Sequence, residues 1–305
     1  MRCLIIHNPA SGPSSDEIYA FTHALAQGGD EVVMRFIGDG MEPEDAVADV
    51  REFDRVVVSG GDGTVSNVLD QMRGCGVPTL VFPSGTACLF FNNIGNAPEA
   101  AALAKACRAG RTVKVDMGEL FWLDENGNEK RHGFIIIAGS GFDAEIMMKA
   151  APTKNDIGEI AYFLSALATP NPTVAHFTIE HDGIVEELDG ICCMAGNTSV
   201  IQNDINLFPN CRMNDGMVDI VVIEPVRTVQ LLPTVITVAL DPAGKVLGRP
   251  QFKIIQTKEA KITCTPSLGM QVDGEIISSN SGVFAARALP QCLDIIVDEF
   301  SPLGK

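Results

Sequence analysis

Apolar and polar residues follow a regular alternation in the first third of the chain. Short apolar runs, typical of buried strands, alternate with longer amphipathic segments, typical of helices. We predict strands over RCLIIHN, DEVVMRFI, DRVVVSG and VPTLVFP. We predict helices over 16–26 (with Ser14 or Ser15 as the N-cap), 42–52, 64–73 and 98–109, the last ended by Gly110. Strands that alternate with helices indicate a mostly parallel sheet with helices on both faces.

The pattern changes after Gly110. Long strands are predicted over 111–123 and 129–139, and short ones over AHFTIEHDG, EELDGICCMAG, MVDIVVIE, AKITCTP and MQVDGEII. Helical segments are expected near Ile157–Ala168 and Thr228–Leu240. Many short strands separated by turn signals indicate an antiparallel, sandwich-like second domain. The closing segment CLDIIVDEF also has the composition of a strand, but its periodicity does not place it in a sheet.

Composition narrows the function classes. The 305 residues are 46% hydrophobic and 20% charged, which is enough apolar material for two cores. A formal net charge of −17 argues against nucleic acid as a partner, and against binding to anionic membranes by charge alone. Nine cysteines without a C-x-x-C motif indicate reduced thiols in a cytoplasmic protein. The histidines lack metal-ligand spacing, and no apolar segment reaches the roughly 20 residues that span a bilayer.

Three small, glycine-containing loops follow predicted strands of the first domain. They are HNPASG, GGDGT and FPSGTA, at residues 7–12, 60–64 and 82–87. Glycine permits close backbone approach, and a following helix presents N–H groups that attract phosphate. Asp62 would fit such a site if a magnesium ion or a ribose hydroxyl lay beside it. Alternatively, a tight turn in which Asp62 caps the helix explains one loop, but three loops at one sheet edge favour a phosphate site.

Two acidic motifs occur late in the chain. On an extended strand, Asp273 and Glu275 of MQVDGEII would face the same side, where they could hold magnesium or accept a proton from an attacking hydroxyl. The alternative is an ordinary hairpin turn at DGE. Asn214, Asp215 and Gly216 are also typical of a turn, and a cation bound by Asp215 and backbone carbonyls is the more specific hypothesis.

In this order, the motifs resemble the diacylglycerol kinase catalytic family, in its bacterial soluble lipid kinase branch, which is related to the sphingosine kinases. The resemblance extends over nearly the whole chain. It rests on NPASG, GGDGT, PSGTA, GSGFDAE, NDGMVDIVVI and VDGE, beginning at residues 8, 60, 83, 139, 214 and 272. GGDGT alone is shared with NAD kinases, whereas the late DGE is more specific.

The resemblance implies a two-domain fold with the site in the cleft. An α/β nucleotide-binding domain like that of NAD kinase and diacylglycerol kinase would comprise 1–130 plus 291–305, so that the last strand returns to it. A β-rich, sandwich-like lipid or substrate domain would comprise 131–290. The implied activity is magnesium-dependent transfer of the γ-phosphoryl group of ATP to the hydroxyl of a diacylglycerol-like lipid.

The resemblance also assigns residues. Glu275 would be the proton acceptor, with Asp273 beside it and Asp62 in the phosphate turn. The nucleotide would contact Asn8, Pro9, Ala10, Ser11, Gly12, Gly60, Gly61, Asp62, Gly63, Thr64, Val65, Ser66 and Thr86. Asp215, with the backbone carbonyls of Arg212 and Met217, would hold a structural magnesium ion. Asp116 matches a further acidic position near the site.

Several positions depart from the family pattern and keep rival functions open. The family usually has Asn and Glu where Ser66 and Asn67 stand, and often Asn and Asp where Cys88 and Leu89 stand. The usual Thr at the end of the second strand is replaced around Met34 or Arg35. The alternatives are an NAD kinase-like or other small-molecule kinase, and a catalytically degenerate protein that binds lipid or nucleotide. Transient peripheral contact with a membrane and a homodimer are both compatible with the sequence.

Overall fold

The computed structural model divides the chain into two compact units. Unit 1 comprises Met1–Met117 and Pro290–Lys305, and unit 2 comprises Gly118–Leu289. The described residues are 1–12, 16–38, 40–141, 172–202, 205–206, 208–225, 241, 251–279 and 281–304. The predicted helices at 157–168 and 228–240, and the proposed cap residues Ser14 and Ser15, lie outside these ranges. Among the described residues, no helix is long and apolar enough to cross a bilayer.

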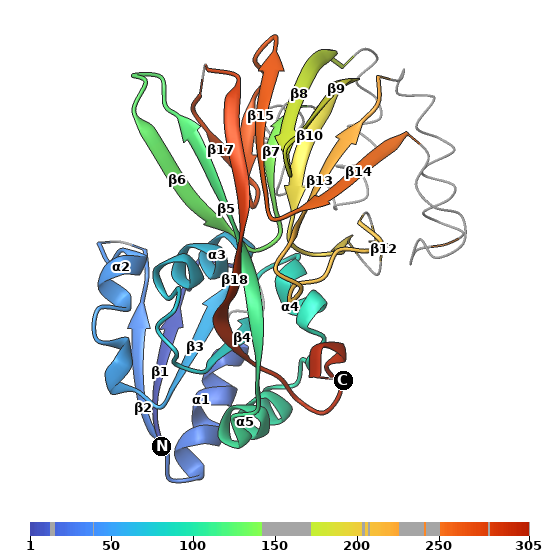
Figure 1. Cartoon of the computed structure of the whole chain (residues 1–305). Helices are drawn as coiled ribbons and strands as arrows, with labels where there is room; N and C mark the ends of the chain where they lie inside the picture. Colours follow the sequence, from blue (N-terminus) through green and yellow to red (C-terminus); the bar gives the residue numbers. More distant parts are fainter. Residues whose placement is uncertain are drawn as a thin grey trace. The chain divides into compact units, whose positions relative to one another are not determined.

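Unit 1 is built on a parallel sheet (Figure 1). Its order is β2 (Glu31–Phe36), β1 (Arg2–His7), β3 (Arg55–Gly60), β4 (Thr79–Pro83) and the end of β18 (Val283–Ile296). All these neighbours are parallel, which confirms the predicted sheet type. β1, β3 and β4 are buried along nearly their whole length, as continuous apolar runs predict. The closing strand pairs with β4 at Ile295 and Thr79, as the resemblance implies.

The helices of unit 1 connect these strands. They are α1 (Glu17–Gln27), α2 (Pro43–Ala46), α3 (Asp62–Gln71), α4 (Leu89–Ile94) and α5 (Ala100–Ala109), with short 3-10 turns at Val50–Glu52 and Pro302–Gly304. α1 packs against α5, and Phe21 of α1 contacts Phe82 of β4 edge-to-face. Gly110 ends α5 with φ +63, as predicted. The sequence pattern did not predict α4.

The second helix is much shorter than the predicted 42–52. In a continuing helix, the Ala46 carbonyl would accept the Val50 N–H. Here the Arg35 guanidinium donates to that carbonyl at 2.7 Å and forms a two-pronged ion pair with Asp49. The Val50 N–H turns instead to the Val47 carbonyl. A side chain from β2 therefore ends α2, which a pattern of local residues cannot reveal.

Unit 2 contains two antiparallel sheets. One contains β9 (Ile184–Gly190), β8 (Ala175–His181), β15 (Glu259–Thr265) and the start of β18, and also β5 (Thr112–Leu123) and β6 (Glu129–Phe134). The other has the order β14 (Phe252–Thr257), β13 (Val218–Ile223), β10 (Cys192–Gly196), β7 (Ile137–Gly141), β16 (Met270–Val272) and β17 (Glu275–Ile277). A separate pair is formed by β11 (Val200–Gln202) and β12 (Ile205–Asn206).

One hydrophobic core joins the two sheets of unit 2. Phe177, Ile262 and Phe284 come from one sheet, and Ile220 and Val222 come from the other. Two layers of antiparallel strands around a shared apolar core form a sandwich, which confirms the predicted class of this half. All nine cysteines of the chain carry free thiols, and six of them are buried.

Candidate active site

The turn after β3 is shorter than the sequence predicts. β3 ends at Gly60, Gly61 is the N-cap of α3, and the helix begins at Asp62 rather than at Thr64. The first amides of a helix lack intrahelical partners, and the helix dipole adds partial positive charge there. Gly61 supplies no side-chain oxygen to these amides. This is the arrangement in which helix N-termini bind phosphate.

Asp62 connects this turn to the loop after β4. The Leu89 and Phe90 N–H groups, at the start of α4, donate to its two carboxylate oxygens at 3.0 Å each. The residue before them, Cys88, has φ +47 and forms no side-chain capping bond. Asp62 therefore serves as a cap, as one sequence interpretation suggested, but it caps α4 instead of its own helix.

The backbones of the glycine loops approach very closely. A Cβ atom on Gly85 would lie 2.6 Å from Gly61 Cα, a distance at which the backbone must move. A Cβ atom on Gly12, which has φ +145, would lie 3.1 Å from the Ser84 carbonyl oxygen. The loops that follow β1, β3 and β4 thus meet at one edge of the sheet, because their glycines leave no side chain between them.

A row of polar side chains joins the same three loops. Asn8 Nδ2 donates to Thr64 Oγ1 at 2.9 Å, and the Asn8 N–H donates to the Ser59 carbonyl. Below them, the buried His7 Nδ1 lies 2.9 Å from Ser59 Oγ, which lies 2.7 Å from Ser84 Oγ. Burial lowers the pKa of His7. The row therefore fixes the loops through neutral hydrogen bonds.

The remaining nucleotide candidates differ in exposure. Pro9, Ala10 and Thr86 are exposed, whereas Val65 and Ser66 are buried in α3. Asp116 is fully buried on β5 and accepts the Gln291 N–H of β18 at 2.7 Å. This bond ties together the two strands in which the chain leaves and re-enters unit 1.

The VDGE motif forms a hairpin, so the expectation of one extended strand is wrong. β16 ends at Val272, β17 begins at Glu275, and these two residues are paired. Asp273 and Gly274 form the two-residue turn, with φ +43 and +90. Positive φ at both central positions is typical of a tight hairpin turn, and Asp-Gly is a favoured sequence for it. Glu275 is exposed, whereas the Asp273 carboxylate accepts hydrogen bonds from backbone amides.

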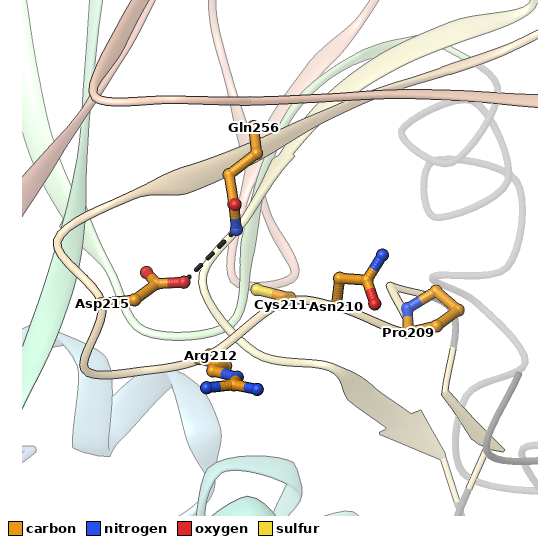
Figure 2. Close-up of a pocket in the computed structure, with 6 residues that line it drawn as sticks. All are labelled: Pro209, Asn210, Cys211, Arg212, Asp215 and Gln256. Carbon is orange, nitrogen blue, oxygen red and sulfur yellow. Dashed lines mark hydrogen bonds between the residues drawn. The ribbon is translucent and has the colours of Figure 1, made fainter. Parts of the chain in front are cut away.

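A cavity of about 380 Å³ adjoins Asp215 in unit 2 (Figure 2). It is lined by Pro209, Asn210, Cys211, Arg212, Asp215 and Gln256. Figure 2 shows the side chains of Asp215 and Gln256 pointing toward each other, with the Gln256 amide donating at 3.3 Å. The other Asp215 oxygen accepts the Met217 N–H at 3.0 Å, which closes the predicted turn. The described residues contain no group of three His, Cys, Asp or Glu that could hold a metal.

Asp219 adds a buried acid to this region. It is 2% exposed, and neither carboxylate oxygen has a hydrogen-bond partner. It pairs with Gln256 across β13 and β14, so the two side chains share a face of the sheet. Burial and the nearby Asp215 raise the pKa of Asp219. Interactions of its carboxylate with the Cys211 thiol and the Gln256 amide act in the opposite direction and lower that pKa. The cation site at Asp215 therefore stays a prediction.

Both units match known protein families. Residues 2–120 match the diacylglycerol kinase catalytic domain. Residues 136–297 match the YegS C-terminal NAD kinase beta sandwich-like domain. The chain belongs to the diacylglycerol kinase catalytic family. The family consists of kinases that transfer phosphate to an alcohol group.

Individual relatives agree with this membership. The chain is 28% identical to a diacylglycerol kinase of Mycobacterium tuberculosis (strain H37Rv) over 75% of its length and 73% of the relative's. It is 27% identical to a diacylglycerol kinase of Bacillus subtilis (strain 168) over 90% of its length and 89% of the relative's. A crystal structure of a diacylglycerol kinase from Bacillus anthracis superposes with a TM-score of 0.72 at 22% identity, covering 98% of this chain and 97% of that one. The structural likeness supports the fold.

The departures from the diacylglycerol kinase family pattern now have structural positions. Cys88 Sγ donates to the Gly85 carbonyl at 3.2 Å, and the backbone amide of Leu89 binds Asp62. These two residues thus shape the loop without an amide or acidic side chain. Ser66 is buried in the second turn of α3, and Asn67 is half-buried beside it.

Sequence reasoning missed Ser59, Ser84 and the contact between Gly61 and Gly85. Both serines directly precede a glycine of the loops, and their side chains form one buried hydrogen bond with each other. A signal was present, since each serine interrupts an apolar run where a strand ends. His7, one of the histidines without metal-ligand spacing, is buried and hydrogen-bonded to Ser59, which gives it a structural role.

Proposed function

We propose that this protein is an ATP-dependent lipid kinase that transfers the γ-phosphoryl group to the hydroxyl of diacylglycerol or a related lipid. The observation that carries the proposal is the approach of Gly61 to Gly85 at the N-terminus of α3. Backbone amides at a helix N-terminus, beside two residues that carry no side chain of their own, suit phosphate groups. Family membership supplies the reaction class.

The proposed nucleotide contacts are Asn8 to Gly12, Gly60 to Ser66 and Thr86. Buried Val65 and Ser66 would contribute through backbone and helix position rather than through projecting side chains. Asp116 would act by holding β18 against β5. The nucleotide enters as its magnesium complex, which offsets part of the phosphate charge.

In the proposed reaction, Glu275 accepts the proton of the lipid hydroxyl. The hydroxyl oxygen then bonds to the γ-phosphorus as the bond to the β-phosphate oxygen breaks, and ADP leaves. Phosphoryl transfer depends mainly on positioning and charge neutralisation, so no P-loop lysine is needed. The exposure of Glu275 leaves its carboxylate accessible to an acceptor.

A structural cation is proposed beside Asp215. The carboxylate of Asp215 and the backbone carbonyls of Arg212 and Met217 would hold magnesium, with Asp219 as a nearby buried charge. Oxygen donors of this kind suit Mg²⁺ or Ca²⁺. The ion would fix the loop before β13. A lipid acceptor further implies transient contact between this cytoplasmic protein and a membrane.

The test is phosphoryl transfer from labelled ATP with magnesium to a panel of acceptors. Diacylglycerol in mixed micelles should become labelled, and the Glu275→Gln protein should lose at least about 100-fold in kcat. Labelling of NAD or another soluble alcohol in place of lipid would show that the protein is a small-molecule kinase.

A catalytically degenerate binding protein is the second candidate, favoured by Cys88 and Leu89 at positions where the family often has Asn and Asp. Calorimetry with the magnesium–ATP complex separates the two. Binding together with lipid labelling supports the kinase. Absence of nucleotide binding, with retained lipid binding, supports the degenerate protein.

A further inference from the structure

Residues 135–137, where the chain passes from β6 into β7, are held by two polar residues through both side chain and backbone. The N–H groups of Ile135, Ile136 and Ile137 all donate to the carboxylate of Asp273, at 2.7, 2.9 and 2.9 Å. The Asp273 N–H donates back to the Ile137 carbonyl at 2.8 Å. Ile135 and Ile136 are buried, so these amides have little access to water as an alternative partner.

The other side of this segment is bound by Asn197, which follows β10. Its N–H donates to the Ile136 carbonyl at 2.9 Å, and its side-chain amide donates to the Ile135 carbonyl at 3.2 Å. Asn197 is fully buried. The segment is therefore fixed between the end of β10 and the β16–β17 hairpin, with a hydrogen-bonding partner for each of its three N–H and three C=O groups.

The same aspartate fixes the start of β17. Asp273 occupies the first central position of the turn, and the Gly274 N–H donates to the buried Gln271 side chain at 2.9 Å. Glu275 is the next residue and pairs with Val272. Because two residues separate the paired positions, the backbone at Glu275 can shift only if the turn at Asp273 also shifts.

Glu275 and Asp273 are both carboxylates of one turn, but their surroundings differ. Asp273 accepts three amide hydrogen bonds, two on Oδ1 and one on Oδ2. A proton taken up by this carboxylate would weaken those bonds, so it is a poor proton acceptor. Glu275 is exposed instead.

We propose that Asp273 is a positioning residue that sets the place of Glu275 by binding the 135–137 backbone, and that it takes no part in proton transfer. The proposal rests on the proposed role of Glu275 as the proton acceptor. It removes Asp273 from the catalytic pair that the sequence suggested, and it gives residues 135–137 a role in the active site.

The test compares Asp273→Asn with Glu275→Gln in the full-length protein. Both changes remove one carboxylate charge from the same hairpin, but only the first disturbs the bonds to 135–137. Amide hydrogen exchange of residues 135–137 should become at least about 10-fold faster in Asp273→Asn and stay unchanged in Glu275→Gln. Asp273→Asn should also lose about 10- to 100-fold in kcat, with KM for ATP within about twofold of wild type.

The pH profile separates positioning from chemistry. The acidic limb of the kcat profile should remain at the same pH in Asp273→Asn and disappear in Glu275→Gln, because only Glu275 exchanges a proton with the acceptor. Loss of that limb in Asp273→Asn, with slow amide exchange retained, would overturn the proposal. Faster exchange with full kcat would also overturn it, since the bonds would then not position the site.

A second variant covers the case in which Asp273→Asn does not fold. Asp273→Glu keeps both carboxylate oxygens but moves them by one methylene, so its exchange rates and kcat should lie between those of wild type and a full loss. If Glu275→Gln retains activity, the proposed base is wrong, while the exchange result still reports whether Asp273 holds the segment. The two failures are therefore distinguishable.

Discussion

Asp62 and Asp273 lie in short sequences that look alike, GGDGT and VDGE, yet their turns are built differently. Asp62 is the first residue of a helix, and its carboxylate accepts hydrogen bonds from two backbone amides at the start of another helix. Asp273 has φ +43 in a two-residue hairpin turn. Its carboxylate accepts hydrogen bonds from the backbone amides of residues 135–137. One turn belongs to unit 1 and the other to unit 2.

The difference shows how an Asp-Gly pair is used. In both turns the aspartate binds backbone distant in sequence, so its carboxylate organises a second segment. In unit 1 the neighbouring glycines allow the backbones of two loops to approach each other closely. In unit 2 the glycine adopts the positive φ that the turn requires. The motif alone therefore identifies an aspartate that binds backbone amides. Only the surrounding structure shows which other residue remains accessible for catalysis.

The largest effect is expected from Asp62→Ala. Two charge-assisted hydrogen bonds would be lost and the amides of α4 would lack a partner, so the free energy of unfolding should fall by about 2–4 kcal/mol. Turnover should fall at least about 100-fold, because the loop after β4 would move. Urea unfolding and lipid phosphorylation measure the two effects.

Asp16→Ala is the matched control, since Asp16 stands at the N-cap of α1 without a side-chain capping bond. Its cost should stay within about 0.5 kcal/mol. An equally small cost for Asp62→Ala would contradict the importance of the bonds to α4.

The close approach of the glycine loops gives the next prediction. Gly85→Ala would place a Cβ atom 2.6 Å from Gly61 Cα, and the loops would have to separate. We expect a loss of about 1–3 kcal/mol in stability and at least about 10-fold weaker binding of the magnesium–ATP complex. Calorimetry and thermal unfolding measure both.

Gly61→Ala sharpens this result, because its Cβ atom would meet Gly85 Cα at 3.8 Å, an ordinary contact. Its stability should be close to wild type. Weaker nucleotide binding in a stable Gly61→Ala protein would then report directly on phosphate approaching Gly61. Equal stability losses in the two variants would show that the tight contact is not limiting.

Gly274→Ala tests the hairpin with a smaller effect. At φ +90 a side chain is strained, and the cost should be about 1–2 kcal/mol. Gly127, in the exposed turn between β5 and β6, has φ +78, and a Cβ atom there would have no neighbour within 4 Å, so Gly127→Ala should cost a similar amount. Only Gly274→Ala should lower kcat. Equal kcat values in the two variants would show that the turn at Gly274 does not affect catalysis.

The smallest effect concerns pH. Burial lowers the pKa of His7 below its usual 6.5, so the folded protein holds a neutral ring while the unfolded chain takes up a proton below that pH. This contribution to stability is complete above about pH 6.5 and is lost as the pH falls below it. His7→Asn should therefore reduce the fall in Tm between pH 7 and 5 by at most about 2 °C.

Much of the fold follows from local patterns in the sequence. Continuous apolar runs identified β1, β3 and β4, and Gly110 identified the end of α5. The end of α2 was missed because Arg35 reaches it from another strand. The hairpin at Asp273 was left open because an aspartate tolerates both an extended conformation and positive φ.

The candidate site shows the same limit. The glycine loops were identified as a group, because each follows an apolar run. The partners of Asp62 and Asp273 were not, because they lie 27 and more than 130 residues away in sequence. Contacts of that kind are set by the sheet order, which spacing along the chain does not encode.

β5 and β18 carry the chain out of unit 1 and back into it, so unit 1 is assembled from two segments that are far apart in sequence. A fragment ending near residue 120 would lack the strand beside β4, and it would expose an unpaired parallel edge that invites aggregation. Joining residues 290–305 to that fragment through a short linker, or supplying them as a separate peptide, should restore the missing strand. During synthesis on the ribosome, the sheet of unit 1 can be completed only after residues 290–305 have been made.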